Sequence, residues 1–240
     1  MSSNLKPLIL HAHSTGPNPY KIAIALEALA IPYEVKLWQF GDGENGLKGP
    51  RFLKISENGR VPALEDPNTG VVSWESGACL NYLLRVYDKE NKLSPGNSEQ
   101  DRVDLDKWTF FLVSSIGPMM GQVNWFRHYH ASKNEDALAR YEEQAYRTFG
   151  VLEGQLQSHD GSYILPGKNI SAADVHTYPW VYVFCFLLPS PPLNFISRYQ
   201  HGYAQLSLDK YPGISKWLQA VGGLKEVKAA YEKVPKGEEQ

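Results

Sequence analysis

The pattern of apolar and polar positions changes once along this chain. Up to residue 88, short apolar runs alternate with helical patterns, as in a mixed α/β domain. From residue 99 onwards, apolar residues recur at spacings of three and four, which is typical of helices that bury one face. The stretch between these parts is polar and contains Pro95 and Gly96, as linkers do. The pattern predicts an α/β domain over 1–88, a linker over 89–98 and an all-helical domain over 99–240.

The elements of the first part follow the order of a thioredoxin-like domain. Two predicted strands, 8–10 and 33–38, are separated by a helix that Asn18 opens with a proline behind it. Because a helix connects the two strands, they are expected to run parallel. A hairpin over 63–73 and a helix over 76–87 complete the unit. The predicted fold class is a thioredoxin-like α/β domain followed by an all-α domain.

The second part contains helical patterns only. One long helix is predicted over 99–130, with a bend at Gly117 and Pro118. Later, Ser171 and Asp174 form a capping box at the start of another helix. The segment 180–211 is rich in aromatic residues and is split by prolines, so it cannot be one continuous helix. We expect it to add a lid or pocket wall, or to pack against the small domain.

Charge and composition exclude several classes of function. The formal net charge is −2 with both signs interspersed, which favours neither a nucleic-acid partner nor an anionic membrane. No apolar run is long enough to span a bilayer, and the first residues lack the pattern of a secretion signal. With Cys79 and Cys185 as the two cysteines, neither a disulfide framework nor a zinc site is predicted. We expect a cytoplasmic protein without a metal.

The most informative residues lie near the end of the α/β domain. Val61 precedes Pro62 where a strand is expected to start, a position that proline tolerates. If the bond between them is cis, the backbone N–H and C=O of Val61 point outward and can pair with an extended peptide. Glu75 and Ser76 follow at a helix start, where the helix N-terminus attracts a carboxylate and Glu75 can accept an ammonium group. A peptide edge beside a cradle for an amino-acid head group predicts a site for glutathione.

With these motifs the chain resembles the glutathione S-transferase family. It is most similar to the fungal branch related to the yeast nitrogen-catabolite regulator and to the bacterial nu class. The matching stretches are 16–23, 60–64, 74–77, 118–122, 125–130 and 171–174. The resemblance implies a glutathione-binding thioredoxin-like domain, a helical domain with an apolar wall for a second substrate, and a two-fold homodimer.

Three residues are candidates for contacting the sulfur of glutathione. A free thiol has a pKa of about 8.5, so a catalyst working at neutral pH must stabilise the thiolate. Ser14, Thr15 and Asn18 lie between the first strand and the first helix, where the family activates the sulfur. The resemblance makes Asn18 the counterpart of the asparagine that this branch uses. Asn18 is also a good helix cap, so Ser14 and Thr15 remain alternatives.

The resemblance also implies the remaining parts of the site. The carboxylate of the glycyl unit needs a cation, for which Arg60 and Lys48 are the candidates. The second-substrate pocket is expected against the long helix, in a stretch that contains Met119, Met120, Asn124 and Trp125. No metal ligand is expected among these residues.

The function implied by the resemblance is that of a glutathione transferase. Such an enzyme directs the glutathione thiolate at an apolar electrophile, in detoxification or on a fungal secondary metabolite. Glutathione-dependent disulfide reduction and isomerisation are alternatives within the same site. A non-catalytic regulator or carrier that binds glutathione or another ligand is the rival of a different class, and it would contain the same Glu75 and Ser76.

Overall fold

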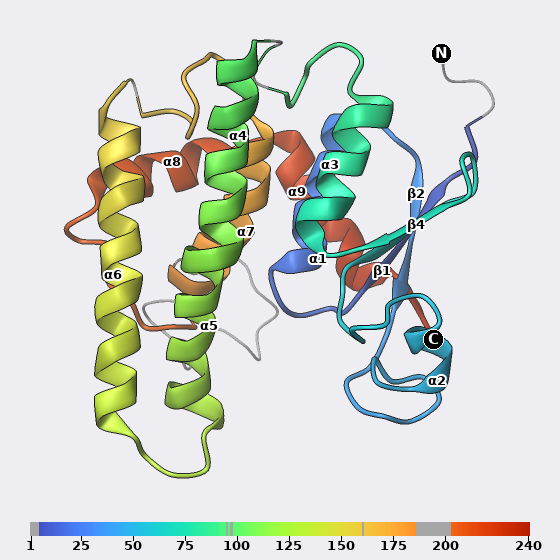
Figure 1. Cartoon of the computed structure of the whole chain (residues 1–240), viewed down its shortest axis with the longest axis horizontal. Helices are drawn as coiled ribbons and strands as arrows, with labels where there is room; N and C mark the ends of the chain where they lie inside the picture. Colours follow the sequence, from blue (N-terminus) through green and yellow to red (C-terminus); the bar gives the residue numbers. More distant parts are fainter. Residues whose placement is uncertain (1–4, 95, 97, 160, 186–202) are drawn as a thin grey trace. The chain divides into compact units, whose positions relative to one another are not determined.

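The computed structural model describes residues 5–94, 96, 98–159, 161–185 and 203–240, with the backbone alone for 183–185. The chain forms two compact units (Figure 1). The first contains Met1–Gly96 and Gly222–Gln240, and the second contains Asn97–Val221. The boundary after Gly96 falls inside the linker that the sequence predicts.

A five-stranded sheet in the order β4-β3-β1-β2-β5 forms the middle of the first unit. Strands β1 (Leu8–Ala12) and β2 (Tyr33–Leu37) run parallel, as the intervening helix requires. Strands β3 (Ala63–Asp66) and β4 (Val71–Trp74) form the predicted hairpin, and β3 runs antiparallel to β1. This arrangement is the predicted thioredoxin-like fold.

Helices cover both faces of this sheet. Figure 1 shows α1 (Asn18–Ala28) and α3 (Ser76–Tyr87) on one side, and the short α2 (Pro50–Leu53) on the other. Helix α1 contacts α3, β1 and the C-terminal helix α9 (Lys225–Lys233). Because neighbours surround it, α1 is buried at every position from Pro19 to Leu26.

The end of the chain corrects the predicted domain boundaries. The sequence placed everything after residue 99 in the helical domain, whereas α9 and the strand β5 (Glu238–Glu239) belong to the first unit. Val227 and Ala230 are the buried positions of α9. Their spacing predicts a helix that packs against another element, but it does not indicate to which unit that element belongs. Beyond the short 3₁₀ helix η4 (Val234–Lys236), β5 pairs with β2. Lys36 and Glu238 form an ion pair across this new edge.

The second unit consists of helices in the part of it that the structure describes. The predicted long helix is an unbroken helical run composed of α4 (Glu99–Phe111), the π-helix η1 (Leu112–Ile116), α5 (Gly117–Asn124) and the π-helix η2 (Trp125–Tyr129). The first π segment ends directly before Gly117 and Pro118, where the sequence predicts a bend. Proline lacks the N–H that would continue the helical ladder, and a π turn absorbs such an irregularity.

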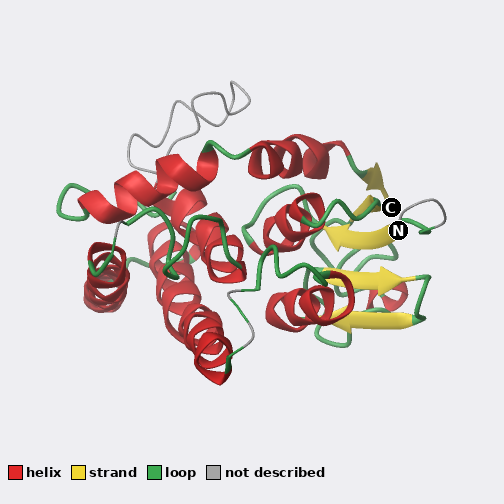
Figure 2. Ribbon diagram, turned by 90° about the horizontal axis from the view of Figure 1, so that it is seen from above, coloured by secondary structure: helices red, strands yellow, loops and turns green. Residues whose placement is uncertain are grey.

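In the described part of the second unit three more helices follow (Figure 2), and buried carboxylates hold the starts of the last two. They are α6 (Glu135–Gln157), α7 (Ala172–Cys185) and α8 (Pro212–Gly222). One bond of the predicted capping box is present, since the backbone N–H of Ser171 donates to the Asp174 carboxylate at 2.8 Å, and the Ser171 hydroxyl donates to the same carboxylate at 2.6 Å. Glu153 accepts from the first N–H groups of α8. Most of the segment 180–211 lies outside the described residues, so the predicted lid or pocket wall does too.

Among the residues that the structure describes, no helix combines the length and the apolar character needed to cross a bilayer. No group of three or more His, Cys, Asp or Glu side chains in the same residues is arranged to hold a metal ion.

Candidate functional site

The Val61–Pro62 peptide bond is cis, as the glutathione argument requires. Pro62 is buried directly before β3, and the half-buried Val61 packs against the apolar cluster that contains Trp38 and Phe52. Strand pairing begins only at Ala63, which lies opposite His11 on one neighbour and Trp74 on the other. The backbone of Val61 therefore lies outside the sheet ladder, at the place where an added peptide would continue it.

Glu75 adopts an unusual backbone conformation at the start of α3. Its φ of 70° lies in the left-handed region, which is costly for a residue with a side chain. Glu75 occupies the N-cap position of α3, yet its side chain makes no capping hydrogen bond and is exposed. The Glu75 carboxylate therefore faces solvent and does not cap its own helix. Strain of this kind is found at ligand sites, where the surrounding structure maintains it.

The hairpin register brings the two halves of the predicted site together. Ala63 of β3 lies directly opposite Trp74 of β4. Pro62 precedes the first of these residues and Glu75 follows the second, so both are at the same end of the hairpin. Val61 therefore lies at the same end of the hairpin as Glu75 and Ser76. The binding of a tripeptide along this edge remains a prediction.

A buried lysine that the sequence did not single out, Lys21, contacts Ser76 from the interior of the first unit. Lys21 of α1 is 1% exposed, and its Nζ donates to the Ser76 hydroxyl at 3.2 Å. Burial lowers the pKa of Lys21 well below its ordinary value, while the nearby Glu75 carboxylate acts in the opposite direction. The sequence offers one signal for this burial, which is that Lys21 directly precedes an apolar run. The sequence does not show that other elements enclose α1, so the signal is not sufficient to predict a buried lysine.

The three sulfur candidates share the loop between β1 and α1, and the structure changes the interpretation of one of them. Pro17, not Asn18, occupies the N-cap of α1, and no side-chain capping bond is present. The expectation that Asn18 caps the helix is therefore wrong, because Asn18 is already the first helical residue and the cap position falls on the proline before it. Ser14 and Thr15 are exposed, and Thr15 Oγ1 is 2.9 Å from His13 Nδ1. A role of Asn18, Ser14 or Thr15 at the sulfur remains a prediction.

The two predicted cations are exposed, and one is tied to the site. Lys48 Nζ donates to the carbonyl of Asn58 at 2.6 Å, which fixes the lysine to the segment that leads to Val61. Gly59 makes this approach possible, since a Cβ there would lie 2.6 Å from the carbonyl oxygen of Leu47. Arg60 is exposed beside it. Both cations are thus on the Val61 side of the cradle, and their role toward the glycyl carboxylate remains a prediction.

The four predicted pocket residues of the helical unit differ in exposure. Met120 and Asn124, which are four residues apart on α5, are 0% and 5% exposed. Asn124 Oδ1 has no hydrogen-bond partner among the described residues. Met119 is half-buried, and Trp125 is 49% exposed. Met120 is therefore a core residue of the structure, and a role of any of the four toward a second substrate remains a prediction.

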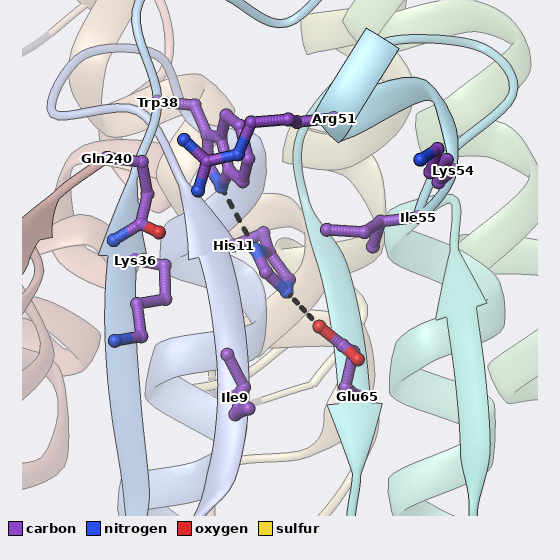
Figure 3. Close-up of a pocket in the computed structure, with 9 residues that line it drawn as sticks. All are labelled: Ile9, His11, Lys36, Trp38, Arg51, Lys54, Ile55, Glu65 and Gln240. Carbon is purple, nitrogen blue, oxygen red and sulfur yellow. Dashed lines mark hydrogen bonds and ion pairs between the residues drawn. The ribbon is translucent and has the colours of Figure 1, made fainter. Parts of the chain in front are cut away.

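A second polar network occupies a cavity of about 360 Å³ in the first unit (Figure 3). Trp38 Nε1–H donates to His11 Nδ1 at 2.9 Å, so the His11 proton is on Nε2, which lies 2.6 Å from a Glu65 oxygen. Burial lowers the pKa of His11. The lining residues are Ile9, His11, Lys36, Trp38, Arg51, Lys54, Ile55, Glu65 and Gln240. None of the predicted glutathione residues lines this cavity.

Comparisons with known proteins agree with this architecture. The models "Glutathione S-transferase, N-terminal domain" and "Glutathione S-transferase, C-terminal domain" match residues 6–85 and 116–224. The glutathione S-transferase-like protein gedE of Aspergillus terreus is 34% identical over 219 residues, which are 89% of this chain and 89% of that protein.

Two solved structures are similar over nearly the whole length. Glutathione transferase URE2P6 from Phanerochaete chrysosporium, in complex with oxidized glutathione, is 32% identical with a TM-score of 0.80, covering 96% of this chain and 97% of that chain. The nitrogen regulation fragment of the yeast prion protein URE2P is 28% identical with a TM-score of 0.80, covering 97% and 99%. By these matches, which extend over both units, the chain belongs to the glutathione S-transferase family.

Proposed function

We propose that this protein is a glutathione transferase that binds glutathione along the Val61–Ser76 edge and stabilises its thiolate. The observation that carries the proposal is the hairpin register, which sets the cis Val61–Pro62 bond beside Glu75 and Ser76. In the proposed complex the cysteinyl backbone pairs with Val61. The γ-glutamyl ammonium contacts Glu75, and its carboxylate contacts Ser76 at the N-terminus of α3. Lys48 and Arg60 attract the glycyl carboxylate.

The proposed chemistry depends on ionising the glutathione sulfur. Lowering a thiol pKa by about two units corresponds to about 2.7 kcal/mol of preferential stabilisation of the anion. Hydroxyl and amide donors on the loop before α1 can contribute this, and Ser14, Thr15 and Asn18 supply such donors. The thiolate then attacks an electrophilic carbon, forming an S–C bond while the leaving group departs with its electron pair.

Finer expectations belong to the same proposal. The electrophile is apolar, a fungal secondary metabolite is one candidate class, and Met119, Met120, Asn124 and Trp125 belong to the helix against which it binds. We expect a two-fold homodimer in the cytoplasm. Light scattering of the purified protein tests the dimer, and a monomer would contradict it.

Glutathione-dependent disulfide reduction is the second candidate, favoured by the similarity to a transferase solved with oxidized glutathione. No cysteine occurs in the loop between β1 and α1. Cys79 is buried, and burial raises the pKa of its thiol to about 11. A reductase reaction in this site would therefore use glutathione thiolates rather than Cys79.

An ultraviolet titration of the protein with glutathione tests the proposal. The absorbance band of the thiolate is followed from mildly acidic to mildly alkaline pH. We expect the band of bound glutathione to persist well below the free-thiol pKa of about 8.5. Binding without an ionised sulfur would favour the non-catalytic regulator, a role suggested by the similarity to the URE2P nitrogen regulation fragment. A protein that does not bind glutathione would overturn both.

A further inference from the structure

The sheet of the first unit has one fully covered face and one that is covered only in part. Leu8, Leu10 and Ala12 of β1 are 0% exposed and lie on the face that packs against α1. Side chains alternate along a strand, so Ile9 and His11 lie on the opposite face. Helix α2 has only four residues, and beside it this face is hollowed into the cavity of about 360 Å³ (Figure 3). A cavity of this size is large enough for a small organic molecule.

The strand register determines the floor of the cavity. Ile9 lies opposite Glu65 of β3, and His11 lies opposite Lys36 of β2, so these four side chains share one face of the sheet. Glu65 accepts a hydrogen bond from His11 Nε2 at 2.6 Å. Lys36 forms an ion pair with Glu238 of β5. The charged groups of the floor therefore have partners within the protein.

Two cations on the α2 side of the cavity have no carboxylate partner among the described residues. Arg51 and Lys54 both line the cavity, and their spacing of three places them on one face of a helical turn. Arg51 donates to the neutral amide oxygen of Asn45 at 2.7 Å, and its guanidinium lies 5.6 Å from the centroid of the Trp38 ring. These contacts hold the guanidinium in place without neutralising it. Glu65 is the one carboxylate side chain among the lining residues.

The chemistry of the lining favours an anion with an apolar body. A guanidinium group pairs with both oxygens of a carboxylate, and an adjacent ammonium group strengthens the attraction. Arg51 and Lys54 supply these two groups on the same side of the cavity. Ile9 and Ile55 add apolar surface to the lining, which an aliphatic or aromatic body can cover.

We propose that this cavity is a second ligand site, which binds a small organic carboxylate with an apolar body independently of glutathione. Arg51 and Lys54 bind the carboxylate, and Ile9 and Ile55 contact the body. None of the predicted glutathione residues lines the cavity, so this inference does not rest on the proposed function. Binding changes no covalent bond of the ligand.

Fluorescence titration with 2-naphthoate tests this inference, with the uncharged 2-naphthamide as the matched ligand. We expect the wild type to bind 2-naphthoate with a Kd on the order of 0.1 mM, and 2-naphthamide at least about tenfold more weakly. Equal affinity for the two ligands, or no binding of 2-naphthoate, would overturn the proposal.

Glutathione separates this site from the Val61–Ser76 edge. Saturating glutathione should leave the affinity for 2-naphthoate unchanged, and displacement of 2-naphthoate by glutathione would overturn the proposal. A protein that binds 2-naphthoate but not glutathione would contradict the proposed function and support this second site.

Variants locate the bound carboxylate. Arg51→Met and Lys54→Met are each expected to weaken 2-naphthoate binding on the order of tenfold, with little change for 2-naphthamide. Lys89→Met is the matched control, because Lys89 is exposed and does not line the cavity, and it should bind as the wild type does. Circular dichroism establishes that each variant is folded. Lys54 is exposed, so Lys54→Met tests the site even if Arg51→Met does not fold. Wild-type affinity in Lys54→Met would overturn the assignment.

Discussion

Two buried bases of the first unit, His11 and Lys21, illustrate how a structural network differs from a candidate site. Both ring nitrogens of His11 are engaged inside the unit, one by Trp38 and the other by Glu65. Lys21 instead donates to Ser76, at a helix N-terminus beside the exposed and backbone-strained Glu75. The first network ties β1 to β3 and to Trp38. The second lies behind Glu75 and Ser76, the residues that we propose bind the glutathione head group.

The largest expected effect is on glutathione binding, in the pair Glu75→Ala and Glu65→Ala. Glu75→Ala removes the acceptor of the ligand ammonium and should weaken binding about a hundredfold while the protein stays folded. Glu65→Ala removes a carboxylate from the other network and should leave the affinity unchanged. Titration calorimetry measures both. If Glu75→Ala binds glutathione as tightly as the wild type does, the site assignment is wrong. If both variants lose affinity equally, the two networks do not differ in their role toward glutathione.

The next effect is on stability. His11→Phe leaves the indole N–H of Trp38 and the carboxylate of Glu65 without their imidazole partner, so the free energy of unfolding should fall by about 1–3 kcal/mol. Glutathione affinity should not change. Urea unfolding and calorimetry give the two quantities. A variant as stable as the wild type would show that the His11 network contributes nothing to the fold.

Asn18→Ala distinguishes stabilisation of the sulfur from binding of the head group within the proposed site. If the amide stabilises the thiolate, turnover should fall on the order of tenfold, about 1.4 kcal/mol in the barrier, with little change in glutathione affinity. Steady-state kinetics with a model aryl halide electrophile, alongside binding measurements, provide the check. Unchanged turnover would transfer the sulfur role to Ser14 or Thr15, for which Ser14→Ala and Thr15→Ala are the matched variants.

The smallest effect is a pH dependence of stability. Burial lowers the pKa of His11 below its ordinary value of 6.5, so the unfolded chain takes up this proton first as the pH falls. The stabilisation is complete above about pH 6.5 and declines below it, by at most about 1.4 kcal/mol per pH unit. Melting temperatures of the wild type and His11→Phe, compared between mildly acidic and neutral pH, should show this slope only in the wild type. A slope shared by both would assign it to another group.

Much of the first unit could be predicted because its signals are local. Turn chemistry and short apolar runs gave the β3–β4 hairpin, and Pro62 gave the site of the cis bond. The place of Glu75 and Ser76 at a helix start was predicted correctly, and their role toward glutathione stays a prediction. Lys21 was missed because a lysine in a helix is normally on the surface, and its burial depends on α3 and α9 enclosing α1.

Other features had no adequate local signal. Strand β5 contains two residues, too few for an alternating pattern, and the spacing of apolar residues in α9 does not say which unit it joins. The two π segments differ from α-helix by a small change in hydrogen bonding, with Pro118 as the one hint. The network of His11, Trp38 and Glu65 joins residues from three strands or their ends, so only the folded sheet reveals it.

A crystal structure of the protein with glutathione tests the central claim most directly. We predict that the cysteinyl backbone pairs with Val61, and that the γ-glutamyl ammonium and carboxylate contact Glu75 and Ser76. Lys21 Nζ should remain within hydrogen-bond distance of Ser76 Oγ. Glutathione bound instead in the cavity beside His11 and Glu65, with the Glu75 edge empty, would contradict this account.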